Sequence, residues 1–198
     1  MKNKPDFKTK PSLTQGDCLL RPFQEQDIPE LIEILNDPIV NHLTGSVITS
    51  EEAEAKMTPE ETLQVSKWYR TRNAQLDRLD LALVSLKLNK IVGEVVLNEW
   101  DQANNSCNFR ILIGPTGRDQ GLGSIATKLI VKYAFNYLKL HRLELEVYTF
   151  NPRARHVYEK NGFIYEGTRR QVLNYDGQWY DADLLAMLKS DYQASLKS

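Results

Sequence analysis

One short segment of the sequence has the residue types and spacing of an anion-binding loop. The segment RDQGLGSIATKLI, residues 118–130, places Gly121 and Gly123 directly before a regular series of apolar residues, with Arg118 ahead of them. Glycines that open a helix leave its first amide N–H groups free, and the helix dipole adds partial positive charge, so a phosphate binds well there. A loop that only needs glycine backbone angles would give the same pattern, so the glycines alone leave both interpretations open.

Two nucleotide-binding folds can be compared with this segment. GLGSIA formally satisfies the dinucleotide pattern G-x-G-x-x-A, but PTGRDQ separates the preceding strand from Gly121. The rest of the chain also lacks the repeated βαβ units of a dinucleotide domain. A P-loop needs G-K-[ST] at the helix start, and Lys128 lies two turns too late. We therefore set both nucleotide folds aside.

The composition limits the class of protein. The chain has 198 residues, a net charge of −1 and 41% hydrophobic residues, which suits one domain with an ordinary core. This balance gives no attraction to nucleic acid or an anionic membrane, and no apolar run is long enough to span a bilayer. The polar start lacks a secretory signal, so we expect a cytoplasmic protein. Cys18 and Cys107 form no metal-ligand spacing, and we expect no metal site.

Hydrophobic periodicity predicts the elements of the N-terminal half. Residues 1–15 are polar, contain two prolines and read as a flexible arm. Thr58, Pro59 and Glu61 form a helix start with a capping box. The predicted elements here are a strand at 18–23, a helix at 24–37, a mixture of short helix and loop at 41–56, and a helix from 58 to about 74.

The second half predicts a meander of strands followed by alternating strands and helices. Asn151 and Pro152 begin a short helix, and Asp176-Gly177 is a strong signal for a two-residue hairpin turn. The predicted elements are a hairpin of 79–86 and 91–100, a strand at 107–114, an amphipathic helix at 121–138, a strand at 141–150, a helix at 152–161 and a closing hairpin. We expect one mixed α/β domain over residues 16–198.

Two motifs at matching distance resemble a known enzyme family. RDQGLGSIATKLIVKYAF is similar to the acetyl-coenzyme A signature of the GCN5-related N-acetyltransferases (GNAT), and NPRARHVYEKNGF resembles their second motif, N-x-x-A-x-x-x-Y-E-K-x-G-F. Segments near both ends resemble the branch that contains the Rim-type ribosomal-protein and spermidine acetyltransferases: CLLRPFQEQDIPELIEILNDPIV and EGTRRQVLNYDGQWYDADLLAML. The resemblance covers nearly the whole chain apart from residues 1–15 and about 44–60. It implies the GNAT fold, an α/β (α+β) arrangement with a mixed central sheet, a splayed parallel strand pair and flanking helices.

The resemblance also implies where acetyl-CoA would bind. Its pantetheine would pair with strand backbone at Ile111, Leu112 and Ile113, and its pyrophosphate would rest on amides of the glycine loop. Gly121 and Gly123 would be glycines because a Cβ would block the phosphate. Ser124 could donate to a phosphate, although a serine near a helix start is common without a ligand. The cofactor-binding residues implied in this way are Ile111, Leu112, Ile113, Arg118, Asp119, Gln120, Gly121, Leu122, Gly123, Ser124, Asn151 and Tyr158.

The implied activity is transfer of an acetyl group to a primary amine of a small molecule, a polyamine or a protein N-terminus. Tyr158 matches the family's general acid, and a phenol can protonate a departing thiolate. The position at which Rim-type enzymes often carry a glutamate is Asn108 here, and an amide cannot accept a proton. Glu94 on the neighbouring strand is the best substitute base. A solvated strand glutamate would fit the sequence equally well.

A second hypothesis is a non-catalytic acyl-CoA-binding module. Asn108 in place of glutamate, and Ala154 in place of the serine of Rim-type enzymes, both remove groups that would help the chemistry. The resemblance places an acceptor pocket between the N-terminal helices and the closing hairpin, where aromatic residues could line it: Trp68, Tyr69, Trp100, Trp179 and Tyr180. A homodimer is a further expectation of the resemblance alone.

Overall fold

A single mixed sheet of eight strands connects both halves of the chain in the computed structural model, which describes residues 5–197. The strand order is β1-β2-β3-β4-β5-β6-β8-β7, and every neighbouring pair is antiparallel except β5 and β6. The strands are β1 Leu13–Gln15, β2 Cys18–Arg21, β3 Leu79–Ser85, β4 Lys90–Asp101, β5 Ser106–Ile113, β6 Arg142–Tyr148, β7 Ile164–Tyr175 and β8 Gln178–Leu188. The mixed α/β class with one parallel pair, expected from the sequence, is confirmed.

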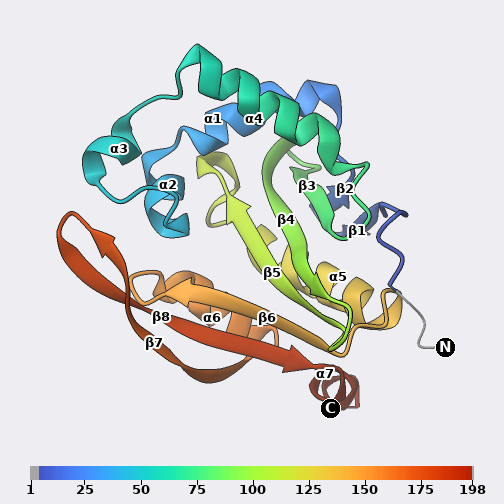
Figure 1. Cartoon of the computed structure of the whole chain (residues 1–198). Coiled ribbons are helices and arrows are strands. Elements are labelled where there is room, and N and C mark those ends of the chain that lie inside the picture. Colours follow the sequence, from blue (N-terminus) through green and yellow to red (C-terminus); the bar gives the residue numbers. More distant parts are fainter. Residues whose placement is uncertain (1–4, 198) are drawn as a thin grey trace.

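Helices cover both faces of this sheet (Figure 1). The helices α1 and α4 pack on one face through a small apolar cluster, and α5 packs on the other face through the main core. The helices are α1 Ile28–Leu35, α2 Pro38–Thr44, α3 Ser50–Glu54, α4 Pro59–Arg72, α5 Leu122–Asn136, α6 Pro152–Lys160 and α7 Lys189–Ser195, with 3-10 turns at Glu25–Asp27 and Pro115–Gly117. The C-terminal α7 was not expected from the sequence.

The beginning of the chain differs from the expected flexible arm of residues 1–15. Phe7 is 1% exposed and its ring lies 5.5 Å from that of Trp100. Residues Leu13–Gln15 pair with β2 as the edge strand β1. The apolar Phe7 and Leu13 provide buried surface that the polar composition of the segment concealed. Residues 1–4 lie outside the described part of the chain.

Capping residues fix the starts of three helices, α2, α4 and α6. Thr58 and Glu61 form the predicted capping box of α4, and Asn151 caps α6 by accepting a hydrogen bond from the Ala154 amide. Pro38 follows the helix predicted at 24–37 and itself begins α2, because the Asp37 carboxylate accepts from the Val40 amide at 2.9 Å. This cap turns a segment with weak helical signals into a helix that packs against β5.

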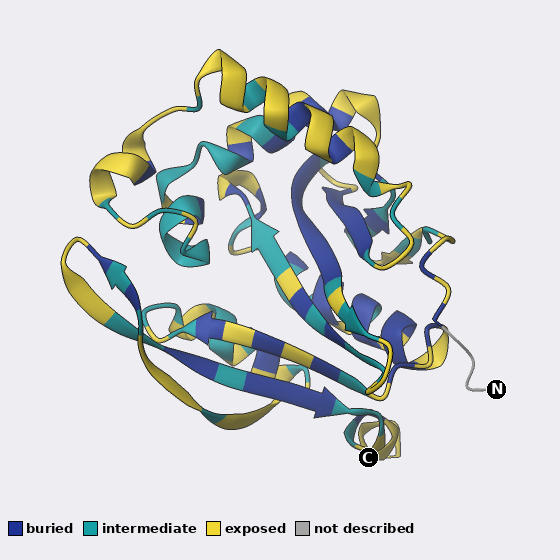
Figure 2. Cartoon of the chain, in the orientation of Figure 1, coloured by how far each residue is buried: buried dark blue, intermediate teal, exposed yellow. Residues whose placement is uncertain are grey.

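Burial along the strands separates the two halves of the sheet (Figure 2). All residues of β3 are buried, as are those of β4 from Ile91 to Leu97, because helices lie over both of their faces. In β6 the buried residues Leu143, Leu145 and Val147 alternate with exposed neighbours, so only one face of that strand is covered. The other face of β6 is therefore open to solvent, in contrast to β3 and most of β4.

The parallel pair β5–β6 holds together over only three residue pairs. Pairing runs from Ser106↔Arg142 to Asn108↔Glu144 and then stops, whereas β5 remains paired with β4 as far as Ile113↔Gly93. Beyond Asn108 the backbone groups of β5 that face β6 therefore have no partner strand. The splayed parallel pair that the family resemblance implied is present.

We expect Gly93→Ala to lower the free energy of unfolding by about 1–3 kcal/mol, because overpacking in a closely packed sheet forces the backbone to move. A Cβ at Gly93 would lie 2.1 Å from the backbone oxygen of Leu112. Urea denaturation measures the change. The matched control is Gly167→Ala, where nothing lies within 4 Å of the added atom; an equal loss of stability in both variants would contradict the prediction.

Candidate active site

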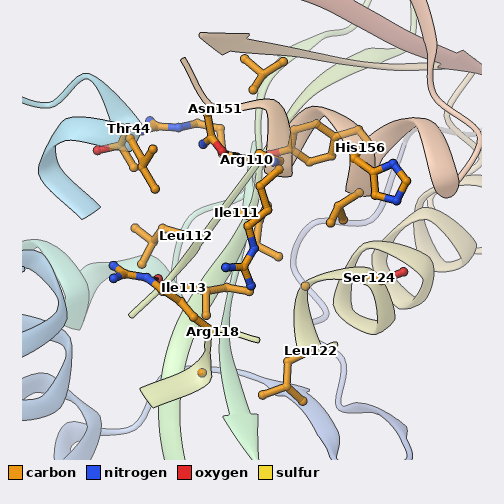
Figure 3. A pocket seen from close by; sticks show the side chains of 18 of the residues that line it. Thr44, Arg110, Ile111, Leu112, Ile113, Arg118, Leu122, Ser124, Asn151 and His156 are labelled. Atoms are coloured by element: carbon orange, nitrogen blue, oxygen red, sulfur yellow. Dashed lines mark hydrogen bonds between the residues drawn. The ribbon is translucent and has the colours of Figure 1, made fainter. Parts of the chain in front are cut away.

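A cavity of about 400 Å³ opens where β5 and β6 separate. Strand β5, the glycine loop, the start of α5 and the first turns of α6 surround it, as Figure 3 shows. Of the sequence-predicted residues, those that line it are Glu94, Ile111, Leu112, Ile113, Arg118, Asp119, Gly121, Leu122, Gly123, Ser124, Asn151 and Tyr158. Gln120 does not line the cavity; its side-chain amide instead bonds the backbone oxygen of Thr116.

The glycine loop ends in a helix start without a side-chain cap. Gly121 precedes α5 with φ of 73°, a left-handed conformation that favours glycine, and no side chain accepts a bond from the first turn. A Cβ at Gly121 would meet nothing within 4 Å, and one at Gly123 would lie 3.1 Å from Ile113 Cδ1. Within the protein itself, backbone conformation therefore accounts for Gly121 without a phosphate, whereas a side chain at Gly123 would only require the end of Ile113 to shift. The uncapped amides of α5 nevertheless suit an anion.

The two charged residues before the glycines already have partners. Arg118 forms an ion pair with Asp37, the cap of α2, and its Nε donates to the Ile113 carbonyl at 3.3 Å. Asp119 pairs with Arg153 of α6 at 2.9 Å. The charge of Arg118 is therefore partly neutralised, and its main contact joins the loop to the N-terminal helices.

Tyr158 lies on α6 at the floor of the cavity. The residue is 6% exposed, and its ring packs between Phe109 and Phe163 with centroid distances of 6.0 Å to each. Burial raises the pKa of Tyr158 to about 12, and the positive charge of Arg110 partly opposes this. A phenol with this pKa stays protonated at neutral pH, so it can act as a proton donor. Within the described residues the hydroxyl has no hydrogen-bond partner, which leaves it available to a ligand.

Glu94 is a buried carboxylate that opens on the same cavity. It is 7% exposed, and its Oε2 atom has no hydrogen-bond partner among the described residues. Burial raises the pKa of Glu94 from 4.5 to about 7, although a hydrogen bond from Tyr69 of α4 lowers it. Glu94 is therefore buried, and it is not the solvated strand glutamate that would also fit the sequence. A carboxylate with a pKa near neutrality suits a general base.

Three polar residues of the predicted site also have structural partners. Ser124 accepts a hydrogen bond from the Asn161 side chain at 3.0 Å, and its own hydroxyl proton remains available. Asn151 caps α6 while lining the cavity. Asn108 donates to Asn98 at 3.0 Å, so an amide pair between β4 and β5 stands where a glutamate was expected from related enzymes.

Several residues that line the cavity were not predicted from the sequence, and some residues that were predicted to line a pocket lie elsewhere. Arg110 on β5, Tyr148 on β6 and the apolar side of α2 line the cavity, the last through Val40 and Leu43. Arg110 could have been noticed as the one charge inside the apolar strand segment NFRILI. The aromatic residues proposed for an acceptor pocket do not line this cavity; Tyr69 is close to it through Glu94, Trp100 packs on Phe7, and Trp179 is 56% exposed near the tip of the last hairpin.

Comparison with known proteins agrees with this arrangement. The family model for the acetyltransferase (GNAT) domain matches residues 17–164. The chain belongs to the GNAT acetyltransferase family. It is 31% identical over 102 residues to spermidine N(1)-acetyltransferase of Vibrio cholerae, and 33% identical over 106 residues to that of Escherichia coli K12. These alignments cover 52% and 54% of this chain but only 59% and 57% of the two relatives, less than two thirds of their length.

Solved structures of this GNAT family have the same fold. The spermidine N-acetyltransferase of Vibrio cholerae, determined in complex with CoA and spermine, superposes with a TM-score of 0.78 at 21% identity. The match covers 90% of this chain and 99% of that one. An acetyltransferase of the GNAT family from Bacillus anthracis gives a TM-score of 0.75 at 20% identity, with 91% and 99% covered. At these identities the likeness concerns the fold.

None of the helices in residues 5–197 is both long and apolar enough to cross a membrane. Within the same residues, no group of three or more His, Cys, Asp or Glu side chains is placed to hold a metal ion.

The raised pKa of Glu94 predicts a pH-dependent stability. The native state binds more protons than the unfolded state between pH 4.5 and about 7, so stability falls as pH rises through this window. Glu94→Gln removes the ionisation, and we expect it to gain about 3 kcal/mol relative to wild type between pH 4.5 and 8. Urea denaturation at both pH values measures this. Glu99→Gln, an exposed residue of the same strand, is the matched control; equal pH dependence in wild type and Glu94→Gln would contradict the raised pKa.

Proposed function

We propose that the protein transfers the acetyl group of acetyl-CoA to a primary amine. One observation carries the proposal: Tyr158 and Glu94 open on the cavity formed where β5 leaves β6. Among residues 5–197, the Tyr158 hydroxyl and one Glu94 carboxylate oxygen have no hydrogen-bond partner. An acid and a base on one cavity are what amide formation from a thioester and an ammonium needs. Membership of the GNAT family supports the same reaction.

The residues of the cavity suit acetyl-CoA. The first amides of α5 have no cap, so they can bind its pyrophosphate. The unpaired edge of β5 after Asn108 can bind its pantetheine amides as a neighbouring strand would. Alternate residues of β5 face β4, and because Gly114 donates to Val92, Leu112 also faces β4 opposite Glu94. Arg118 donates to the Ile113 carbonyl, so this edge offers free groups chiefly at Ile111. When bound, acetyl-CoA would supply the activated acetyl group as a thioester.

The two proton transfers can be assigned to the two unpartnered groups. Glu94 takes a proton from the incoming ammonium, and the neutral amine nitrogen then forms a bond to the acetyl carbon. The C–S bond breaks, and Tyr158 supplies a proton to the leaving sulfur. The nitrogen loses its second proton, which restores the Tyr158 hydroxyl through water, and Glu94 releases its proton to solvent. The products are an N-acetylated amine and CoA.

A first test combines binding and turnover. Acetyl-CoA is expected to raise the melting temperature, whereas NAD and ATP are not, because the loop and strand edge match its pyrophosphate and pantetheine. Release of free thiol across a panel of primary amines then separates an enzyme from a non-catalytic acyl-CoA-binding module. Tight acetyl-CoA binding without thiol release for any amine would favour the module.

Tyr158→Phe is expected to lower kcat by about 100-fold, because general acid catalysis typically contributes 10²- to 10⁴-fold. Acetyl-CoA affinity should stay within about twofold, since the ring and its packing remain. Thiol release and isothermal titration calorimetry measure the two quantities. Tyr165→Phe is the matched control, because its hydroxyl bonds Thr168 on the exposed hairpin. A loss of acetyl-CoA binding in Tyr158→Phe would contradict the role as acid.

The pH dependence of turnover tests Glu94 as base. Because burial raises the pKa of Glu94 to about 7, kcat/KM should rise with pH up to that value and then level off. Glu94→Gln should lower kcat/KM by about 100-fold or more at pH 8 and abolish this limb of the profile. Glu99→Gln should leave both unchanged. A profile that keeps its limb in Glu94→Gln would assign the base to another group.

A further inference from the structure

Arg110 is a charged side chain in the cavity that the proposed chemistry does not use. It is exposed, lines the cavity, and forms no ion pair or hydrogen bond with any residue of the described chain. In Figure 3 it lies towards Asn151, at the opposite end of the cavity from Leu122. A guanidinium without a protein partner, held beside a reaction centre, is available for an anionic group of a ligand.

Arg110 differs from most other charged residues of the cavity, which form ion pairs. Arg118, Asp119, Glu146 and Arg153 have ion-pair partners, which are Asp37, Arg153, Arg169 and Asp119 respectively. Lys160 has none, but it adjoins Asn161, which bonds Ser124 at the start of α5, so it lies at the end that suits the pyrophosphate. Around the predicted acid and base, the charged side chains of the described cavity that remain unpaired are therefore Arg110 and Glu94.

Arg110 and Glu94 lie on the same face of two neighbouring strands. Arg110 is the register partner of Val96, and Glu94 is the partner of Leu112, so the two charges are diagonal neighbours across β4 and β5. Diagonal neighbours have Cα atoms about 7–8 Å apart. No ion pair forms between them, and the intervening space belongs to the cavity. One small molecule with a cationic and an anionic group close together would fill both positions.

A polyamine fits these two charges poorly. With its reacting ammonium at Glu94, a further ammonium at the Arg110 end of the cavity would meet a free guanidinium, and like charges in a partly enclosed site repel. Apolar residues make up part of this side of the cavity: Val96 is the strand partner of Arg110, Leu112 follows on the same face, and Val40 and Leu43 come from α2. The polar residues of the lining here are Thr44, Tyr148 and Asn151. The cavity thus offers a base, a carboxylate-binding cation and an apolar wall.

We propose that the acceptor amine carries a carboxylate, which Arg110 binds, and that the acceptor is an α-amino acid with an apolar side chain. Glu94 then receives the proton of the α-ammonium, and the apolar wall holds the side chain. This inference rests on the proposed function, because it names the amine that the same cavity acetylates. Arg110 is accordingly a specificity-determining residue.

The experiment measures kcat/KM by thiol release for L-leucine, L-leucinamide and spermidine. Wild type is expected to prefer L-leucine over L-leucinamide by about 10- to 100-fold, the range for a charge-assisted hydrogen-bonded pair. L-leucinamide is a demanding comparison, because its α-amino group, with a pKa of about 8, is neutral more often than that of L-leucine and so reacts more readily. In Arg110→Gln the ratio should fall to about 1 or below, whereas Arg110→Lys should keep part of the preference because only the fork geometry is lost. Arg70→Gln, which removes a surface ion pair with Glu25, is the matched control and should keep the wild-type ratio.

Each outcome decides the inference. A wild-type preference for spermidine or L-leucinamide, or an unchanged ratio in Arg110→Gln, would overturn it while leaving the acetyltransferase activity established. An equal loss of acetyl-CoA affinity in Arg110→Gln would assign Arg110 to the cofactor and also overturn it. If no amine is turned over, the proposed function fails, and calorimetry with CoA-saturated protein decides the carboxylate site. L-leucine binding to wild type but not to Arg110→Gln supports the site, and no binding to wild type overturns it.

Discussion

The separation of β5 from β6 after three residue pairs is the constraint on which the rest of the site depends. A sheet interior normally satisfies its backbone groups strand by strand, so an opening inside a sheet leaves groups that need another partner. Continuous pairing between β4 and β5 keeps one side of the opening rigid. Two helix starts border it, the uncapped one of α5 and that of α6, which Asn151 caps. Strand edge and helix start therefore face one cavity because a single pair of strands diverges.

The opening also explains why a carboxylate can remain buried on β4. Glu94 loses hydration, and only Tyr69 and nearby positive charges offset that loss, so its pKa rises towards neutrality. A buried carboxylate with a raised pKa lowers the free energy of unfolding at alkaline pH, and for that reason such residues are rare in proteins. The position of Glu94 in the cavity suits proton transfer, because a base must have a free oxygen, and Glu94 Oε2 has no hydrogen-bond partner among the described residues.

The N-terminal helices are joined to the site by contacts between residues distant in the sequence. Asp37 caps α2 and also pairs with Arg118 of the glycine loop. One carboxylate therefore joins α2, which lines the cavity, to the glycine loop. On the opposite side, Asp176 at the turn of the last hairpin accepts hydrogen bonds from the backbone and side chain of Ser50 at the start of α3. Both ties position the segment between α1 and α4, which sequence patterns describe poorly.

The sequence by itself determined the features that depend on neighbouring residues. The capping box at Thr58, the cap at Asn151 and the hairpin turn at Asp176-Gly177 were predicted because each depends on local backbone geometry. The motifs also identified the glycine loop and the place of Tyr158 on α6. Tertiary structure alone decided that Glu94 is buried, that Arg118 is engaged by Asp37, and that Arg110 has no hydrogen-bond or ion-pair partner within residues 5–197. Burial and ion pairing depend on which strands and helices become neighbours, and that information is spread over the whole chain.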